Sequence, residues 1–394
     1  MTGSTPYDKS TWQTRCDASQ HNNPYQKVVF LKTHKTASSS LATTFIRYAD
    51  EKHLQLAMPF GFSAIFNEKR AFQHGMVLSL GDMGLFDFMA GHARYNRPEM
   101  DRVVTAAKYV TILRDPVGQL ESAFSYFRMA ENIGNSGSPD PLGSFLNRPD
   151  FYFHNYEYDR KEQSWNGQIY DLGLDHRYHI NETAITDKIK QLDRELDLVL
   201  MTEYYDESMI LLRRLLCWDW MDIVYLAKAI RKNSLRRKEI SPELAARIRL
   251  WNSADVKLYD HFNKTFWQRV AQYGADEFDA DLSYYRKLNH DISQQCLDLS
   301  RSSHYDDRIE AYRLADNAPT FCSRLIRETI PYVRRLKFRY VCSRLIGPAV
   351  ISVTAFVLVV LILLLTLRHK SLCNHHLSSK DLSKNASWNT GDDV

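Results

Sequence analysis

Two short apolar runs in this sequence each end in polar residues that are suited to opening a helix. The run Lys27–Leu31 (KVVFL) precedes a stretch of Lys, Thr and Ser, and the run Lys108–Leu113 (KYVTIL) precedes Arg114, Asp115 and Pro116. β-Branched and aromatic residues favour a buried strand, while Asp followed by Pro favours the first turn of a helix. A strand that leads directly into a helix is the building unit of an α/β fold with a parallel sheet.

The same alternation of short apolar runs and amphipathic stretches continues over residues 25–330, which we expect to form one α/β domain with a central parallel sheet. A third strand is predicted at Leu198–Met201. The Gly-, Ser- and Pro-rich segment Asn132–Ser144 predicts a loop. Helices are predicted at Ser38–Lys52, from Pro116 to about Ala130, at Asp206–Cys217, and from Ser241 through Trp267.

The composition excludes several classes of protein. The 394 residues include 51 Lys and Arg against 47 Asp and Glu, and 44% are apolar, which is ordinary for a globular protein. A net charge of +4 gives no overall attraction to nucleic acid, so any phosphate recognition must be local. The six cysteines form no Cys-x-x-Cys pair. We therefore expect no nucleic-acid partner and no metal.

The segment Pro348–Leu367 (PAVISVTAFVLVVLILLLTL) contains no charged residue and has the length that a helix needs to cross a bilayer. We predict a transmembrane helix here, with a basic juxtamembrane segment at 331–347 and a polar tail at 368–394. The first 24 residues are polar and show no signal peptide. The charges that flank this segment leave the membrane topology open. Three N-x-Ser/Thr sequons do not decide it either, because composition alone would produce a few of them. The sequons lie at Asn181, Asn263 and Asn385.

The first polar cluster, KTHKTASSS at residues 32–40, is predicted to connect a strand to the N-terminus of a helix. Such a terminus offers unpaired N–H groups and a positive dipole, which together bind phosphate-like anions. Lys35 adds a charge, and the hydroxyl groups add donors. The Gly-x-x-x-x-Gly-Lys-Ser/Thr pattern of nucleoside triphosphate sites is absent. Simple capping of the helix by the serines is the alternative.

The second polar cluster combines Arg114, at the end of a strand, with Ser122 in the helix that follows. Arginine can bind one phosphate through two parallel N–H donors, and a serine hydroxyl can add a third. Arg114 could instead pair with Asp115. Two anion sites at neighbouring strand ends indicate a ligand with two separated phosphate-like groups.

The two polar clusters lie in segments that resemble those of a known family. The segments KTHKTASSS and LRDPVGQLESAFSYF are similar to the 5′-phosphosulfate and 3′-phosphate motifs of the galactose 3-O-sulfotransferase family of Golgi carbohydrate sulfotransferases. Four further segments support the resemblance in the same order along the chain, over roughly residues 25–275: GHARY, NGQIYDLG, LVLMTEYYDESMILLRRLLCW and LWNSADVKLYDHFNKTFW.

The resemblance implies a P-loop-like sulfotransferase fold that uses 3′-phosphoadenosine 5′-phosphosulfate (PAPS) as sulfuryl donor. It implies that Arg114 and Ser122 bind the 3′-phosphate of PAPS. It also implies a set of residues for the 5′-phosphosulfate: Lys35, Thr36, Ala37, Ser38, Ser39 and Ser40. The expected acceptor is the 3-hydroxyl of a terminal galactose on a glycolipid such as galactosylceramide, and glycoprotein glycans are the alternative acceptor.

The acceptor hydroxyl must lose a proton, and histidine is the side chain best suited to accept it near neutral pH. His34 is the first candidate base, and His92 is the second. Lys32, together with Lys35, is expected to stabilise the bridging oxygen as the nucleotide leaves. Two polar residues of the NGQIYDLG segment, Asn166 and Asp171, are the candidate contacts to the acceptor sugar.

Family members of this kind carry an N-terminal signal anchor and a lumenal Golgi domain, whereas the span predicted here is C-terminal. A tail-anchored chain and a chain with an incomplete N-terminus both account for this difference. Two rival functions also remain at this stage. One is a membrane-anchored protein of the same fold that binds glycans or nucleotides without catalysis, and the other is a kinase, which the missing Walker glycines disfavour.

Overall fold

The computed structural model describes residues 24–345, apart from 62, 64, 82, 227–229, 232–239 and 303–308. Its centre is a sheet of five parallel strands in the order β2-β3-β1-β4-β5, which confirms the predicted α/β class. The strands are β1 (Val28–Leu31), β2 (Leu56–Ala57), β3 (Phe88–Gly91), β4 (Lys108–Leu113) and β5 (Leu198–Met201).

Strand β1 lies in the middle of the sheet, where Val28 pairs with Phe88 of β3 on one side and with Lys108 of β4 on the other. All five strands run in the same direction, so the segments that follow β1, β3 and β4 meet at one edge of the sheet. Ligands of open α/β sheets bind at this carboxyl edge, where the strand order reverses. The polar residues predicted to bind anions therefore lie where such a fold places its site.

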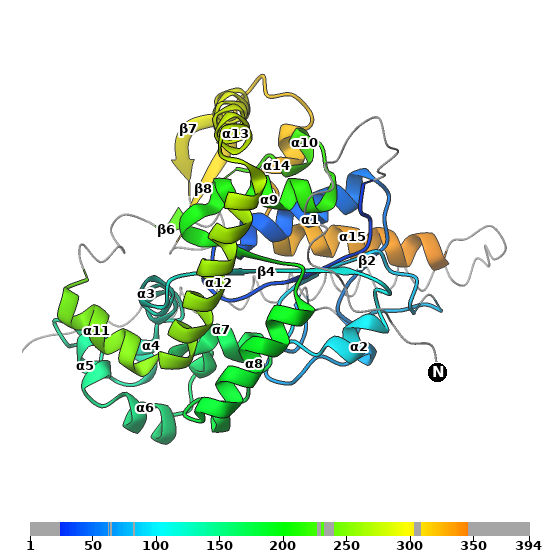
Figure 1. The fold of residues 1–394 in the computed structure, drawn as a ribbon. Coiled ribbons are helices and arrows are strands. Elements are labelled where there is room, and N and C mark those ends of the chain that lie inside the picture. The colour runs from blue at the N-terminus through cyan, green and yellow to red at the C-terminus, as the bar shows by residue number, and fades with distance from the viewer. Residues whose placement is uncertain are drawn as a thin grey trace, which may run out of the picture. The chain divides into compact units, whose positions relative to one another are not determined.

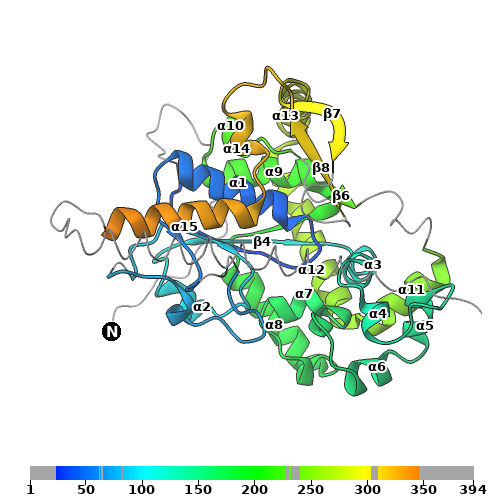
Figure 2. The same ribbon diagram turned by 180° about the vertical axis from the view of Figure 1, so that it is seen from behind.

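Helices cover both faces of the sheet (Figures 1 and 2). Figure 1 shows α1 (Ser38–Glu51) and α9 (Tyr205–Leu216) on one side of β4, and α7 (Gly167–Asp171) and α8 (Glu182–Glu195) on the other. The long helix α12 (Ser253–Tyr273) packs against β5 and α7.

Beneath α1 the core is aromatic, because the ring of Trp218 stacks on Tyr48 with 3.8 Å between centroids and meets Phe45 edge-on. Burial of such large apolar side chains is the main stabilising contribution to a fold of this size.

The predicted strands agree closely with the structure, and the predicted helices differ mainly at their ends. The loop predicted at Asn132–Ser144 is wrong at its C-terminal end, because the Asp140 side chain accepts a hydrogen bond from Gly143 N at 3.0 Å and so begins α5 there.

The remaining helices are α2 (Arg97–Asp101), α3 (Pro116–Tyr126), α4 (Met129–Asn132), α5 (Pro141–Asn147), α6 (Pro149–Asn155), α10 (Trp220–Ile223), α11 (Pro242–Trp251), α13 (Ala275–Cys296), α14 (Cys322–Leu325) and α15 (Thr329–Leu345).

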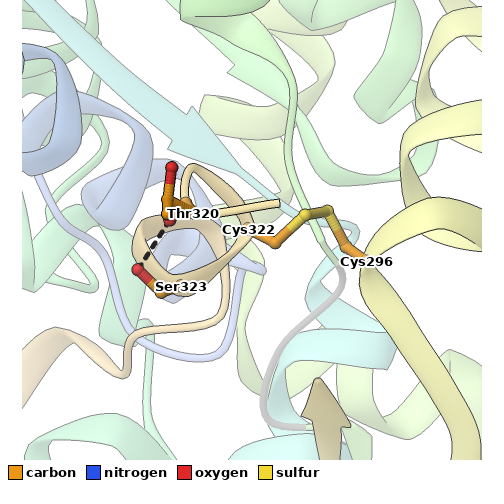
Figure 3. Close-up of a disulfide and its surroundings, with 4 residues drawn as sticks. All are labelled: Cys296, Thr320, Cys322 and Ser323. Atoms are coloured by element: carbon orange, nitrogen blue, oxygen red, sulfur yellow. Dashed lines mark hydrogen bonds between the residues drawn. A yellow bond between two sulfur atoms is a disulfide. The ribbon is translucent and has the colours of Figure 1, made fainter. Parts of the chain in front are cut away.

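A disulfide joins the end of α13 to the start of α14 (Figure 3). Cys296 and Cys322 are both buried, with 5.3 Å between their Cα atoms. The chain between them carries the antiparallel strands β7 (Leu297–Ser302) and β8 (Ile309–Leu314), and β8 also pairs with β6 (Ile230–Arg231). Disulfides of this kind form and persist in oxidising compartments.

Within the described residues, no helix combines the length and the apolar character that a membrane span requires. The predicted span Pro348–Leu367 lies outside those residues and stays a prediction. Leu336 ends the first of two compact units, and the domain limits 25–330 also stay a prediction.

Candidate active site

The segment between β1 and α1 is folded tightly at the carboxyl edge of the sheet. Lys35 and Ala37 both adopt positive φ angles, 61° and 57°, which few non-glycine residues do. The Ser38 hydroxyl donates to Thr33 O at 2.6 Å. The N-cap residue of α1 is Ala37, which makes no side-chain hydrogen bond to the first turn. This geometry fits an anionic group at the helix N-terminus.

The two predicted anion-binding clusters are in direct contact. Nη1 of Arg114 donates to Lys35 O at 3.1 Å, which brings the guanidinium from the end of β4 to the first cluster. Gly118, in the first turn of α3, leaves the room that Arg114 needs, because a Cβ there would lie 3.0 Å from its Nε. Nζ of Lys35 lies 3.4 Å from the centroid of the Tyr126 ring, a cation–π contact within the second cluster.

Asp115 makes two contacts of its own. Its side chain accepts from Val117 N at 2.9 Å, which begins α3 as predicted, and it pairs with Arg249 at 2.5 Å. Ser122 lies in the second turn of α3 and is buried. Its role at the 3′-phosphate stays a prediction.

His34 lies at the centre of the site with only 6% of its surface exposed, and both of its ring nitrogens face carboxylates. Nδ1 is 2.8 Å from Oδ2 of Asp171, which also accepts the backbone N–H of His34 at 2.9 Å. Nε2 is 3.0 Å from Oε2 of Glu68. Gln119 of α3 donates to His34 O at 3.2 Å, which fixes the backbone of the same residue.

His92 follows β3 and stacks on His34, with ring centroids 4.0 Å apart and an interplanar angle of 17°. Its Nδ1 lies 2.9 Å from Lys32 O. Burial, reinforced by the nearby charges of His34 and Lys32, holds the pKa of His92 well below its usual range. Burial also lowers the pKa of Lys32 to about 8, which Glu328 partly opposes. The structure therefore brings together all three predicted catalytic residues, His34, Lys32 and His92.

Glu68 and Arg160 belong to this cluster although no sequence pattern indicated them. The Glu68 carboxylate is 7% exposed and contacts Nη1 of Arg160, besides His34. Arg160 itself has a positive φ of 61° and precedes a short 3-10 helix. Both residues come from loops that are far from His34 in sequence, so only the tertiary fold reveals them. A small cavity beside His34 is lined in part by Glu68, Arg160 and Tyr170.

His34, Glu68 and His92 are close enough together to be tested as metal ligands, since their ligand atoms lie within 4.8 Å of one another. The two imidazole rings are stacked nearly parallel, so the in-plane lone pairs of their nitrogens do not converge on one point. Nδ1 of His92 already faces a backbone carbonyl, and Glu68 already pairs with Arg160. This set does not fit the tetrahedral coordination of zinc, and we derive no metal-dependent step.

Asn166 occupies a structural position. It is fully buried with a positive φ of 49°, and its Oδ1 accepts the backbone N–H groups of Ala254 and Asp255 at 3.0 Å each. The Asp255 carboxylate in turn accepts from Gln168 N at 3.0 Å and Ile169 N at 2.8 Å. Burial raises the pKa of Asp255 to about 7, although these two N–H groups oppose the change. The side-chain oxygen of Asn166 thus contacts α12, and the predicted contact to sugar stays a prediction.

Helix α7 connects both halves of the site. At its start, the Gln168 side chain exchanges two hydrogen bonds with the backbone of Arg114, at 2.8 and 2.9 Å. At its end, Asp171 holds His34, and its second carboxylate oxygen accepts from Gln163 at 2.9 Å. Asp171 is therefore placed to orient His34. A hydroxyl of Thr202, which follows β5, adds a link by donating to Thr36 O at 2.8 Å.

Comparisons with known proteins identify the family of the chain. The family model described as Galactose-3-O-sulfotransferase matches residues 4–357. The chain is 33% identical to galactosylceramide sulfotransferase of Mus musculus over 277 residues, which are 70% of this chain and 65% of that protein. It is 30% identical to galactose-3-O-sulfotransferase 2 of Homo sapiens over 337 residues, 79% of this chain and 83% of that protein. It is also 33% identical to galactose-3-O-sulfotransferase 3 of Mus musculus, over 69% of this chain and 63% of that protein. The aligned part of this chain thus spans about two thirds of the length of the mouse galactosylceramide enzyme.

Proposed function

Because the chain belongs to the galactose-3-O-sulfotransferase family, we propose that it transfers a sulfuryl group from PAPS to the 3-hydroxyl of a terminal galactose. The observation that best supports the proposal is the contact between Arg114 and Lys35, which joins two anion-binding clusters at one sheet edge. A donor with a 5′-phosphosulfate and a separate 3′-phosphate requires two such clusters in fixed relation.

The donor fits the site in the following way. The N-terminus of α1 and the Lys35 side chain hold the 5′-phosphosulfate, together with the hydroxyl groups that follow. Arg114 and Ser122 hold the 3′-phosphate, and Gly118 keeps space open beside the guanidinium. In the P-loop-like folds that this arrangement resembles, the phosphates lie between the first strand and the first helix, as they would here.

PAPS supplies the sulfuryl group, and the protein supplies position and charge. Sulfuryl transfer resembles phosphoryl transfer in that little covalent chemistry falls to the protein, and rate comes from alignment and from neutralising charge. Lys32 and Lys35 lie in the loop itself and stabilise the departing bridging oxygen. His34, which Asp171 aligns, is the first candidate to accept the proton of the acceptor hydroxyl. His92, which stacks on His34, is the second.

The acceptor in this proposal is a galactose-terminated glycolipid such as galactosylceramide. Curated relatives named galactosylceramide sulfotransferase from three mammals support it. Glycoprotein glycans are the second candidate, because the chain matches relatives named only for transfer to galactose at a similar identity.

The disulfide between Cys296 and Cys322 supports a lumenal location for the domain. We propose that this location is the Golgi, as in the family that the chain resembles, with the predicted span Pro348–Leu367 as the contact to the bilayer. The topology of that span stays a prediction.

The experiment is transfer of labelled sulfate from PAPS, by the full chain in detergent, to galactosylceramide and in parallel to a soluble β-galactoside. Transfer to either acceptor supports the enzyme and ranks the two acceptor classes. Thermal protection by 3′,5′-adenosine bisphosphate (PAP) without protection by ATP would reject a kinase. PAP binding with no sulfation of either acceptor would favour the non-catalytic binding protein.

A further inference from the structure

The side chain of Gln163 leads to an inference that rests on the proposed function and names a further residue for the same reaction. We propose that Gln163 is a positioning residue for His34, because it holds the Asp171 carboxylate in the orientation in which that carboxylate contacts the imidazole. Gly167 belongs to the same arrangement, since it leaves the room that the Gln163 amide occupies.

The carboxylate of Asp171 divides its two oxygens between two partners. Oδ2 lies 2.8 Å from Nδ1 of His34 and accepts the backbone N–H of the same residue at 2.9 Å. Oδ1 accepts from Nε2 of Gln163 at 2.9 Å. An ionised carboxylate only accepts hydrogen bonds, so the amide nitrogen of Gln163, not its oxygen, must face Asp171. The hydrogen bond to Oδ1 therefore opposes rotation of the carboxylate away from His34.

The surroundings of Gln163 connect it to the site through Asp171. Gln163 lies in the short 3-10 helix Lys161–Ser164 and is only 2% exposed. Among the described residues, Oε1 of its amide has no hydrogen-bond partner, so the side chain makes its one hydrogen bond to Asp171. We therefore expect a change at Gln163 to act on His34 by way of Asp171.

Gly167, the first residue of α7, fits closely against this amide. A Cβ at this position would lie 2.5 Å from Oε1 of Gln163, which is too close for the amide to stay in place. The same Cβ would lie 3.5 Å from Nε2 of Gln119, which donates to His34 O at 3.2 Å. Gly167 thus lies beside two buried amides, of which one reaches the His34 ring through Asp171 and the other holds the His34 backbone.

The chemical reason for such positioning is the choice between the two ring nitrogens. With Asp171 at Nδ1, the hydrogen of a neutral imidazole stays on Nδ1, and the lone pair that can accept a proton is on Nε2. The oxygens of Glu68 form no hydrogen bond with Nε2, although one of them lies 3.0 Å away. In this proposal Gln163 contacts neither PAPS nor the acceptor, so its loss should lower kcat and leave the affinity for the donor unchanged.

The first test compares Gln163→Met with the wild-type chain. Methionine keeps the length of the side chain and cannot donate to Asp171, so kcat for sulfate transfer should fall by about 10–100-fold, while the Kd of PAP changes by less than about threefold. Gln191→Met is the matched control, because Gln191 bonds to Glu195 within α8, and its kcat should match the wild type. A Gln163→Met variant with wild-type kcat would overturn the proposal.

A double-mutant cycle separates this positioning from simple packing. Alanine suits the helical backbone at Gly167, but its Cβ would displace the Gln163 amide, so Gly167→Ala alone should lower kcat by about 5–50-fold. In a Gln163→Ala background no amide remains to be displaced, and the same change should alter kcat by less than about twofold. An equal loss in both backgrounds would overturn the proposal.

The last test needs neither an acceptor nor a change at Gln163. Nitrogen NMR of the chain labelled at histidine, with His34 assigned by its loss in His34→Gln, reports on the contact between Nδ1 and Asp171. The Nδ1 resonance should shift in Gly167→Ala and stay in place in Gly75→Ala, since a Cβ at Gly75 meets no atom within 4 Å.

An Nδ1 resonance that is the same in Gly167→Ala and in the wild type would overturn the proposal. If the wild type sulfates no galactoside but the resonance shifts in Gly167→Ala, the proposed function fails while the positioning of His34 stands.

Discussion

Asn166 and Asp255 cap each other's helices. The side chain of Asn166, just before α7, accepts two N–H groups at the start of α12, and the carboxylate of Asp255, in α12, accepts two N–H groups at the start of α7. Short helices depend on such caps, because their first N–H groups have no partner within the helix. This reciprocal contact fixes α7, and α7 in turn holds Arg114 through Gln168 and His34 through Asp171.

Replacing Asn166 should therefore destabilise the protein. Asn166→Ala removes two hydrogen bonds and also leaves a residue with a Cβ at positive φ, so the free energy of unfolding should fall by about 2–4 kcal/mol. Asn166→Gly tolerates the positive φ and should lose only the part due to the caps. Urea unfolding measures both values. Equal stability of the alanine variant and the wild type would show that the caps contribute nothing.

Gln168 gives a separate prediction, because it holds the backbone of Arg114 without a predicted contact to PAPS. In Gln168→Ala the guanidinium loses its fixed position, and the Kd of PAP measured by calorimetry should rise by about 5–20-fold. The kcat at saturating PAPS should change by less than about threefold. Gln191→Ala is the control, since Gln191 bonds to Glu195 in α8. An unchanged Kd of PAP would contradict the assignment of Arg114 to the donor site.

The motif residues at the sheet edge could be predicted because they directly follow apolar runs, and β1, β4 and β5 are where those runs indicated. Strand β3, which positions His92, was missed because its four residues lie in a segment without clear alternation. Glu68 and Arg160 could not be predicted, because an isolated charged residue in a loop carries no local pattern. Asn166 was expected at the sugar, and its contacts with the start of α12 could not be predicted, because α12 is distant in sequence.

The disulfide should matter for stability more than for chemistry. Cys296 and Cys322 close a long segment that carries two strands, so the double serine variant should lose about 3 kcal/mol of unfolding free energy. Cys342→Ser is the matched control, since Cys342 is a free thiol. Differential scanning calorimetry without reductant tests this. Identical melting temperatures for the double variant and the control would contradict it.

Acid should destabilise the protein through two histidines, the partly buried His176 and the buried His179. Burial lowers the pKa of His176 to about 3 and of His179 to about 4. Below the unfolded value of about 6.5 the unfolded chain binds protons that the folded protein does not, so stability falls as pH falls from about 6.5 toward 4. His176→Gln should reduce this slope, and the exposed His154→Gln should leave it unchanged. Urea unfolding at several pH values measures it, and a slope unaffected by His176→Gln would contradict the assignment.

His176 also stacks on Tyr170 of α7, with 4.3 Å between ring centroids. If protonation in acid disrupts the stacking of His176 on Tyr170, then α7, the helix that holds both halves of the site, would lose one of its contacts. Arg94 covers the same tyrosine ring at 4.2 Å, and its positive charge further opposes protonation of both histidines.

The central claim is that His34 serves sulfuryl transfer at a site built to bind PAPS. The most direct measurement is labelled sulfate transfer to a terminal galactose, with PAP affinity determined in parallel, for the wild type and His34→Ala. We predict transfer by the wild type, a loss of about 10²–10⁴-fold in the variant, and PAP affinities within about threefold of each other. Wild-type turnover by His34→Ala, or PAP binding without any transfer by the wild-type chain, would contradict the account.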